Sequence, residues 1–227
     1  MFSVLYSVLL RPLSYPEPDG LVAVWNQWEG EAAGQYSDPE YLDLSDQSKS
    51  MTLAASASGS ASIGGERGDA ERVASGFVTA NVFQVLRVAP VLGRSFLPEE
   101  ESSGRSNVVI LSDALWRRHF HGSPDVIGET LLVDAVPHTI VGVLPASLRM
   151  PSEYGSDDSL SILLPLNLDR AAARNKRGGH YLRVVGRLRD GVDVHAAAAE
   201  LANFYREMKQ TYPSQYDIPG FSGYLRP

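Results

Sequence analysis

The sequence predicts an α+β fold with two lobes. Short apolar runs of strand length are joined mostly by hairpin turns, and they do not alternate regularly with helices as in a parallel α/β sheet. The predicted order is strand, helix, strand, strand, helix, a mostly β middle section, then strand and helix. The composition changes at Pro90–Phe96, and strand and helix patterns return at His180. The middle section is therefore expected to be a second lobe inserted into the first.

The first lobe begins with a strand and a well-marked helix. Leu21–Trp25 is a short apolar run with strand character. Ser37–Glu40 is a helix start, in which Ser37 or Asp38 caps, the proline takes the first position and the glutamate favours the helix dipole. The helix is expected to end near Gln47.

A hairpin and a short helix follow. Met51–Ser62 is rich in Ala, Ser and Thr, which suits a strand with small side chains, and Ala70–Val78 is the predicted returning strand. The glycines of Ile63–Asp69 predict the turn between them. Asn81 is expected to cap a short apolar helix that ends at about Leu86.

The middle section contains a buried strand at Val108–Leu111 and a helix that Ser112 caps. Asp113 can pair with Arg117 one turn later. The residues of one helical stripe are Leu111, Leu115, Trp116, His119 and Phe120. Trp116 is therefore expected in the core.

A second hairpin is predicted from Thr130–Val133 and His138–Leu144, joined by Asp134–Pro137. Residues 150–161 are polar and rich in turn formers, which predicts a mobile loop. Ile162–Leu166 is another short apolar strand.

The last third is a strand followed by a helix. Tyr181–Leu188 alternates as a strand does, and Asp193 caps the following helix. The buried stripe of that helix should be Ala197, Leu201, Phe204, Tyr205 and Met208. Pro213 ends the helix, and residues 212–227 are interpreted as a linker.

Composition excludes several classes of protein. The chain of 227 residues is 44% hydrophobic and 21% charged, which is near the globular average and excludes global disorder. It has no apolar run of about 18 residues, so it is not a polytopic membrane protein by itself. The absence of cysteine excludes disulfides, cysteine-ligated metals and cysteine nucleophiles. A net charge of −7 makes it a poor binder of nucleic acid.

Residues 1–13 (MFSVLYSVLLRPL) have two interpretations. Ten residues precede the first charge, Arg11, which is too short to span a bilayer. A basic start and a small-residue cleavage site are both lacking, so it makes a poor signal peptide. The segment is either the outer end of a transmembrane helix or a buried amphipathic segment.

Few residues suit chemistry. His119 and His121 are the one close histidine pair, but at this spacing on a helix their rings point about 200° apart, so a metal site would need the helix to have ended and Asp113 or Asp125 to join. The alternative is that both histidines lie at the C-terminus of the helix, where a histidine interacts favourably with the helix dipole. The sequence has no nucleophile elbow, phosphate-binding glycine motif or zinc-protease motif. We therefore expect no catalytic, cofactor-binding or metal-binding residues.

Two acidic runs and one basic segment remain. Glu99–Glu101 and Asp157–Asp158 offer carboxylates for acid–base chemistry, although solvated loops are the simpler interpretation. The cations of the basic segment are Arg170, Arg174, Lys176, Arg177, Arg183, Arg187 and Arg189. Within it, Arg174, Lys176 and Arg177 form a candidate surface for an acidic partner or lipid headgroups. The alternative is a solvated strand edge protected by arginine.

The order of the motifs resembles the MacB/FtsX-like family of ABC-transporter permeases, specifically their MacB-like periplasmic core domain. The matching segments are Leu9–Leu13, Tyr15–Pro18, Ser37–Tyr41, Arg72–Val73, Thr79–Val88, Pro90–Phe96, Val109–Ser112, Leu115–Trp116, Phe120, Ile127–Gly128, Thr139–Val143, Gly186–Leu188 and Gly191–Val192. The structural motif residues within them are Asn81, Phe83, Gly93, Arg94, Phe96, Leu111, Trp116, Phe120, Gly128, Gly142 and Gly186. Many relatives carry glycine where this chain has Ala135, so a different hairpin turn is expected.

The resemblance implies a division of the chain. Residues 1–20 would be the end of a truncated transmembrane segment with its linker, and 212–227 a linker toward the next span. Residues 21–90 plus 171–211 would form a porter-like α+β subdomain. Residues 91–170 would form an inserted β-rich, sabre-like subdomain.

The resemblance also implies a non-catalytic domain without cofactor on the extracytoplasmic (periplasmic) side of a bacterial inner membrane. Its partners would be the transmembrane helices of the same permease, a separate ATP-binding subunit or domain, and a periplasmic adaptor or other extracytoplasmic protein. It would relay motion from the spans, which requires 13–20 and 208–215 to lie on one side of the domain, with Gly93 and Gly178–Gly179 as hinges. Two alternatives stay open: a free-standing carrier of a lipid or small apolar ligand, and a carboxylate-dependent hydrolase.

Overall fold

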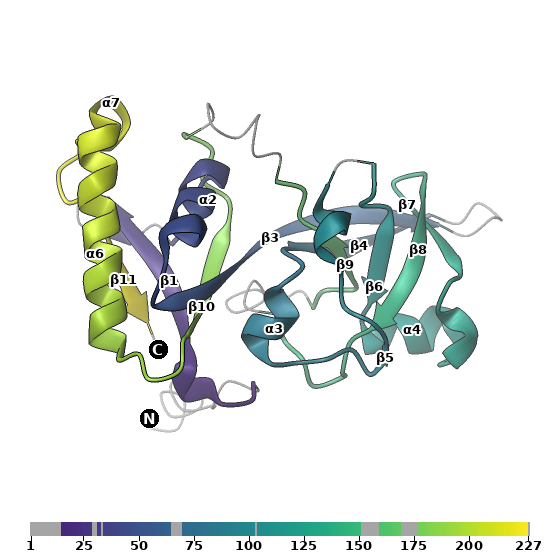
Figure 1. Cartoon of the computed structure of the whole chain (residues 1–227). Helices are drawn as coiled ribbons and strands as arrows, with labels where there is room; N and C mark the ends of the chain where they lie inside the picture. Colours follow the sequence, from purple (N-terminus) through teal and green to yellow (C-terminus); the bar gives the residue numbers. More distant parts are fainter. Residues whose placement is uncertain are drawn as a thin grey trace, which may run out of the picture.

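The described residues form one mixed sheet of eleven strands (Figure 1). The computed structural model describes residues 15–28, 31–32, 34–64, 70–102, 104–150, 159–168 and 177–226. The strands are β1 (Leu21–Trp28), β2 (Glu31–Ala32), β3 (Met51–Gly64), β4 (Glu71–Val78), β5 (Leu92–Gly93), β6 (Val108–Leu111), β7 (Thr130–Val133), β8 (Val136–Val143), β9 (Ile162–Pro165), β10 (Arg183–Leu188) and β11 (Ser222–Arg226). The helices are α2 (Asp38–Gln47), α3 (Val82–Leu86), α4 (Asp113–Phe120), α6 (Val194–Thr211) and α7 (Pro213–Tyr216), with 3-10 helices η1 (Pro18–Gly20), η2 (Pro98–Glu101) and η3 (Pro124–Val126).

The strand order is β11-β1-β10-β3-β4-β9-β6-β8-β5, with β2 on β1 and β7 on β3 and β8. Most neighbouring strands are antiparallel, and the parallel pairs are β4 with β9 and β6 with β8. The helices are few and do not alternate regularly with the strands. The predicted α+β class is confirmed.

Three helices, α2, α4 and α6, begin where the sequence predicts them. Asp193 caps α6 by accepting from the backbone N–H of His195 at 2.6 Å, and all five residues of the predicted stripe are buried. Ser112 caps α4 by accepting from Leu115 N at 3.2 Å. Ahead of α2, Ser37 N donates to the Glu40 carboxylate at 2.8 Å, as in a capping box.

The β7–β8 hairpin turns on two residues rather than four. Asp134 and Ala135 have φ of 49° and 64°, so both central positions are left-handed, as a type I′ turn requires. Ala135 adopts the left-handed conformation that glycine takes without cost, and the expected difference in turn type from the relatives stays a prediction. The turn is also held from outside, because the backbone N–H of Ser62 donates to the Asp134 carboxylate at 2.8 Å.

The tail after Pro213 is not a linker. It forms α7 and then β11, which pairs antiparallel with β1 from Ser222↔Gln27 to Arg226↔Ala23. Tyr216 and Phe221 fix this reversal because both rings are buried and stack with centroids 4.9 Å apart. The sequence interpretation missed this because the segment is too short and irregular to show a period.

Strand β3 is shared by both halves of the molecule. Its first half packs with β1, β10 and α6, and its last residues pack with β6, β7 and β8. A third cluster lies between them and contains Leu21, Val185, Phe83 and Val141. The strand β10 pairs with β1 and β3, as the two-lobe division expects. The boundaries of the two subdomains stay a prediction.

Candidate functional site

A tightly hydrogen-bonded polar site is the junction that holds the approach segment, residues 15–20, against the sheet. This segment leads through η1 into β1 at the lower left of Figure 1, close to the lower end of α3. Residues 1–14, which carry the predicted end of a transmembrane helix, lie outside the described residues. The junction is therefore where the described chain begins.

Arg187 is the centre of this junction. It lies in β10, between β1 and β3, and is only 7% exposed. Its Nε donates to the carbonyl of Val85 in α3 at 2.5 Å, and its two terminal nitrogens donate to the carbonyls of Glu17 at 2.9 Å and Pro16 at 3.2 Å. Burial, and secondarily the nearby charge of Arg87, lower the pKa of Arg187. Three carbonyl acceptors offset the cost of burying the cation.

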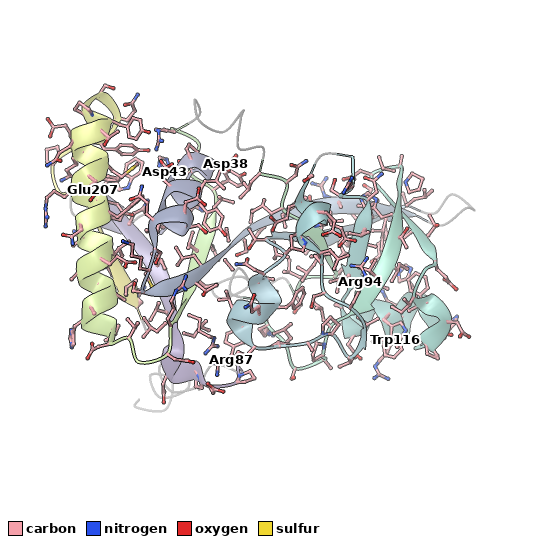
Figure 2. The ribbon with its side chains drawn as sticks, in the orientation of Figure 1. Asp38, Asp43, Arg87, Arg94, Trp116 and Glu207 are labelled. Carbon is pink, nitrogen blue, oxygen red and sulfur yellow. The ribbon has the colours of Figure 1, made fainter. Side chains whose placement is uncertain are left out.

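Two further contacts fix the same segment. The Glu17 carboxylate forms an ion pair with Arg87, at the end of α3 (Arg87 is labelled in Figure 2). The Tyr15 hydroxyl donates to the carbonyl of Arg149, in the turn after β8. The approach segment is thus held by β10, by α3 and by the segment after β8, which belong to both predicted subdomains.

The other end of the described chain returns to the same place. Because β11 runs antiparallel to β1, Arg226 lies opposite Ala23, three residues after the approach segment. The expectation that 208–215 would lie beside 13–20 is wrong: α7 is at the opposite end of β1, at the top of Figure 1. The strand β11, not the helix α6, returns the chain to the approach segment.

The motif residues Gly93, Arg94 and Gly142, together with Glu100, lie in and around β5; we call this group the β5 clip. Arg94 donates two hydrogen bonds to Glu100, at 3.0 and 2.7 Å, and Glu100 is 6% exposed. Burial raises the pKa of Glu100, but hydrogen bonds from Arg94 and Leu97 N outweigh it and hold that pKa below its usual range. The solvated-loop interpretation of Glu99–Glu101 is therefore wrong at Glu100. Glu101 also has a structural role, because its carboxylate accepts from the backbone N–H of Ala80.

Two glycines of this clip are needed for close approach. Gly93 has φ of 74°, and a Cβ there would lie 2.2 Å from the carbonyl oxygen of Val141. A Cβ at Gly142 would lie 2.6 Å from the carbonyl oxygen of Arg94. Gly93 is thus fixed by strand pairing, which argues against its predicted role as a hinge.

The other motif residues are structural too. Phe83 and Phe96 pack with ring centroids 6.3 Å apart. Asn81 precedes α3 without capping it, since its amide donates instead to the carbonyl of Leu53 at 2.8 Å. Leu111 is fully buried, Gly128 has φ of 92°, and Gly186 lies against Leu53 and Met51. Trp116, labelled in Figure 2, is only half-buried, as is Phe120, and its indole N–H donates to Ser123 O at 2.8 Å.

The candidate partner surface is not found as predicted. Arg174 and Lys176 lie outside the described residues. Arg177 is buried, donates to Asp43 at 2.7 Å and lies over the ring of Tyr212 at 3.7 Å, so it is not an exposed cation. The strand-edge alternative is also wrong for Arg187, because β10 is a central strand.

The remaining candidates for chemistry do not assemble. His119 Nε2 contacts Glu71 at 2.8 Å rather than His121, while the predicted Asp113–Arg117 pair is present at 2.8 Å. In the described part of the chain, no three His, Cys, Asp or Glu side chains gather as metal ligands would. Asp157 and Asp158 lie outside the described residues.

Sequence reasoning missed a second buried polar cluster. Glu40 is 2% exposed and accepts from His180 Nε2 at 3.0 Å. Nearby, the Tyr205 hydroxyl donates to the Tyr36 hydroxyl at 2.8 Å, and burial raises the pKa of both phenols well above the usual value. The only sequence signal for this cluster is the glutamate at the capping-box position of α2. That signal does not indicate that Glu40 contacts the remote segment 177–182.

Known structures share this architecture. The fold matches a domain of a permease protein from Porphyromonas gingivalis with a TM-score of 0.66 at 17% identity, over 94% of this chain and 92% of that one. It also matches the periplasmic region of MacB from Actinobacillus actinomycetemcomitans, with a TM-score of 0.62 at 15% identity, over 97% and 93% of the two chains. The extracellular domain of the transporter YknZ from Gram-positive bacteria gives 0.62 at 13% identity, over 91% of this chain and 100% of that one.

The sequence relatives are ATP-binding/permease proteins named MacB. The chain is 27% identical over 133 residues to the macrolide export ATP-binding/permease protein MacB of Burkholderia thailandensis, and 27% identical over 124 residues to that of Escherichia coli K12. These matches cover 59% and 55% of this chain but only 19% and 18% of the relatives.

The family model of the MacB-like periplasmic core domain matches residues 1–204. The chain belongs to this family, as its motifs predict. Within the described residues, no helix is long and apolar enough to cross a membrane.

Proposed function

We propose that this domain relays displacement from membrane spans to an extracytoplasmic partner. The observation that carries the proposal is the junction at Arg187, which binds the approach segment to the sheet and to α3 at once. A displacement of Pro16 or Glu17 would be passed on directly, because a flexible link would dissipate it. The segment 208–215 does not meet the relay's requirement of lying beside 13–20, but β11 takes its place: its pairing of Arg226 with Ala23 brings the last described strand to the side of the domain where the approach segment lies, and this supports the proposal.

The proposed partners are those that membership of the family suggests. The spans would belong to the same permease, and a separate ATP-binding subunit or domain would supply the energy, as in the export proteins that share this domain. An extracytoplasmic adaptor would receive the motion. Those relatives are named for macrolide export, and this chain spans about a fifth of their length.

The test uses the complete permease with its ATP-binding partner in lipid nanodiscs. Two spin labels are attached to this permease at introduced cysteines, Asn203→Cys in α6 and Val136→Cys in the β7–β8 hairpin, after any other cysteines have been removed. Spin-label spectroscopy then measures the distance between these two positions, which lie toward opposite ends of the sheet. ATP should shift this distance distribution. Arg187→Gln should abolish the shift while ATP hydrolysis continues, because the approach segment is no longer held.

The matched control is Arg189→Gln, an exposed arginine just after the same strand. It should keep the shift. The conservative variant Arg187→Lys and the melting temperatures of all variants show whether a lost shift is caused by unfolding of the domain. An undiminished shift in Arg187→Gln, or no shift in the unsubstituted protein while it hydrolyses ATP, contradicts the relay.

One observation favours the carrier as a second candidate. A hollow of about 460 Å³ is lined from both predicted subdomains, with Phe77, Leu164 and Leu166 as apolar lining and His138 and Tyr181 among its polar groups. A carrier would bind an apolar dye such as phenylnaphthylamine there, and Phe77→Glu would abolish the binding. If the dye does not bind, this second function fails.

A further inference from the structure

A polar hollow lies on the ribbon formed by β3 and β4, beside the end of α4. Its volume is about 380 Å³, within the range of small-molecule sites. The described charged side chains that line it are Arg72, Arg118 and Glu71, and the hydroxyl groups come from Ser60, Ser159 and Ser161. These strands continue into the half of the molecule far from the approach segment in Figure 1. The hollow shares no lining residue with the apolar hollow described above, and none of its lining residues belongs to the Arg187 junction.

Both arginines are oriented by the protein. Arg118 Nη2 donates to Glu71 Oε1 at 2.5 Å, and Arg72 Nη2 donates to the Ser60 hydroxyl at 2.7 Å. Each contact uses one terminal nitrogen. Since a guanidinium has five N–H donors in a planar fork, each arginine keeps donors for a ligand.

Glu71 orients Arg118 and competes little with a bound anion. Its second oxygen, Oε2, contacts His119 Nε2 at 2.8 Å, so both carboxylate oxygens are engaged from α4. Two guanidinium groups against one carboxylate leave the lining positive, in a chain whose net charge is −7. The hollow thus differs in sign from the molecule as a whole.

We propose that this hollow binds a phosphate monoester group. Arginine forks match phosphate oxygens in bidentate geometry, and two cations favour a dianion over a single carboxylate. Serine hydroxyls can donate to the remaining oxygens. The phosphate belongs either to a small soluble metabolite or to a lipid headgroup, and both sources present the same chemistry to the arginines.

Calorimetric titration of the 227-residue chain tests the proposal with inorganic phosphate, glycerol 3-phosphate and acetate. Phosphate and glycerol 3-phosphate should bind, and acetate should bind about tenfold more weakly. Arg72→Gln with Arg118→Gln should weaken phosphate binding at least about tenfold. Arg206→Gln, an exposed arginine on α6, is the control and should bind as the unsubstituted chain does.

Vesicles of phosphatidylcholine with and without phosphatidic acid separate the two sources. Binding that requires phosphatidic acid and is competed by glycerol 3-phosphate assigns the lipid, and binding of the soluble esters alone assigns a metabolite. Arg72→Gln alone, on an exposed side chain, guards against misfolding of the double variant. No binding of phosphate, equal binding of acetate, or an unaffected double variant overturns the proposal. None of these results bears on the relay.

Discussion

Glu200→Gln should destabilise the fold by about 2 kcal/mol, because one carboxylate joins α6 to the loop before β3. Glu200 accepts from the Ser48 hydroxyl at 2.7 Å, the Ser50 hydroxyl at 2.8 Å and the backbone N–H of Lys49 at 3.0 Å. Hydrogen bonds to a charged group contribute about 1.5–3 kcal/mol. The neutral amide of glutamine keeps one acceptor oxygen, but its NH₂ group faces the N–H and O–H donors of residues 48–50. Most of the free energy of one charged hydrogen bond is therefore lost. In a chain of this size that is about 4–8 °C in melting temperature.

The pH dependence gives a sharper check. Burial raises the pKa of Glu200, but the hydrogen bonds from Ser48, Ser50 and Lys49 outweigh it, so the folded pKa lies below the unfolded one. A lowered folded pKa contributes stability that is present above the unfolded value, about 4.3, and is lost as pH falls through the folded value. The difference in unfolding free energy between the unsubstituted chain and the Glu200→Gln variant should therefore narrow as pH falls from about 7 to below about 4.

Chemical denaturation at several pH values measures that difference. Glu207→Gln is the matched control: it lies on the same helix but on an exposed position (labelled in Figure 2), and it should cost less than about 0.5 kcal/mol. If Glu200→Gln is as stable as Glu207→Gln at neutral pH, or if the difference does not change with pH, the Glu200 carboxylate contributes nothing as a charged acceptor.

Three further substitutions test the geometry. Ala135→Gly should stabilise the chain by about 0.5–1 kcal/mol, because it removes the left-handed alanine of the β7–β8 turn; a lower melting temperature would contradict this. Trp116→Ala should cost about 2–3 kcal/mol, less than a fully buried tryptophan, and a variant that melts unchanged would show that the ring is mere surface. Gly93→Ala should cost at least about 2 kcal/mol more than Gly122→Ala by denaturant titration, because both have positive φ but only Gly93 has a carbonyl in the way; equal costs would exclude the close approach as the cause.

Local signals predicted most helices and strands correctly. Ser37, Ser112 and Asp193 announce helix starts because a cap is made with residues three or fewer positions away. The α6 stripe was predictable for the same reason, since its period lies within one element. Short strands bounded by turn residues were equally visible.

Partners from remote segments could not be predicted. The sequence around Arg187 alternates between apolar and polar residues, as it would in an edge strand. Arg187 is buried only because β10 lies between β1 and β3. Glu40 stands at a capping-box position, which gives no information on its contact with His180, 140 residues later in the chain. In both cases the decisive contact depends on tertiary structure, which outweighs local charge pattern.

The sheet itself suggests where the two halves can bend, in place of the predicted hinge at Gly93; the predicted hinge at Gly178–Gly179 stays a prediction. Gly93 is fixed by its contact with Val141. The pairing of β3 with β10 ends at Ser56, and its pairing with β7 begins at Ile63. Between these points β3 pairs with β4 alone among the described strands, so the sheet has one free edge there. Under the proposed relay, a displacement that enters at the Arg187 junction would reach β3 through β10, and bending would concentrate where β3 has a single neighbour among the described strands, because fewer backbone hydrogen bonds resist it.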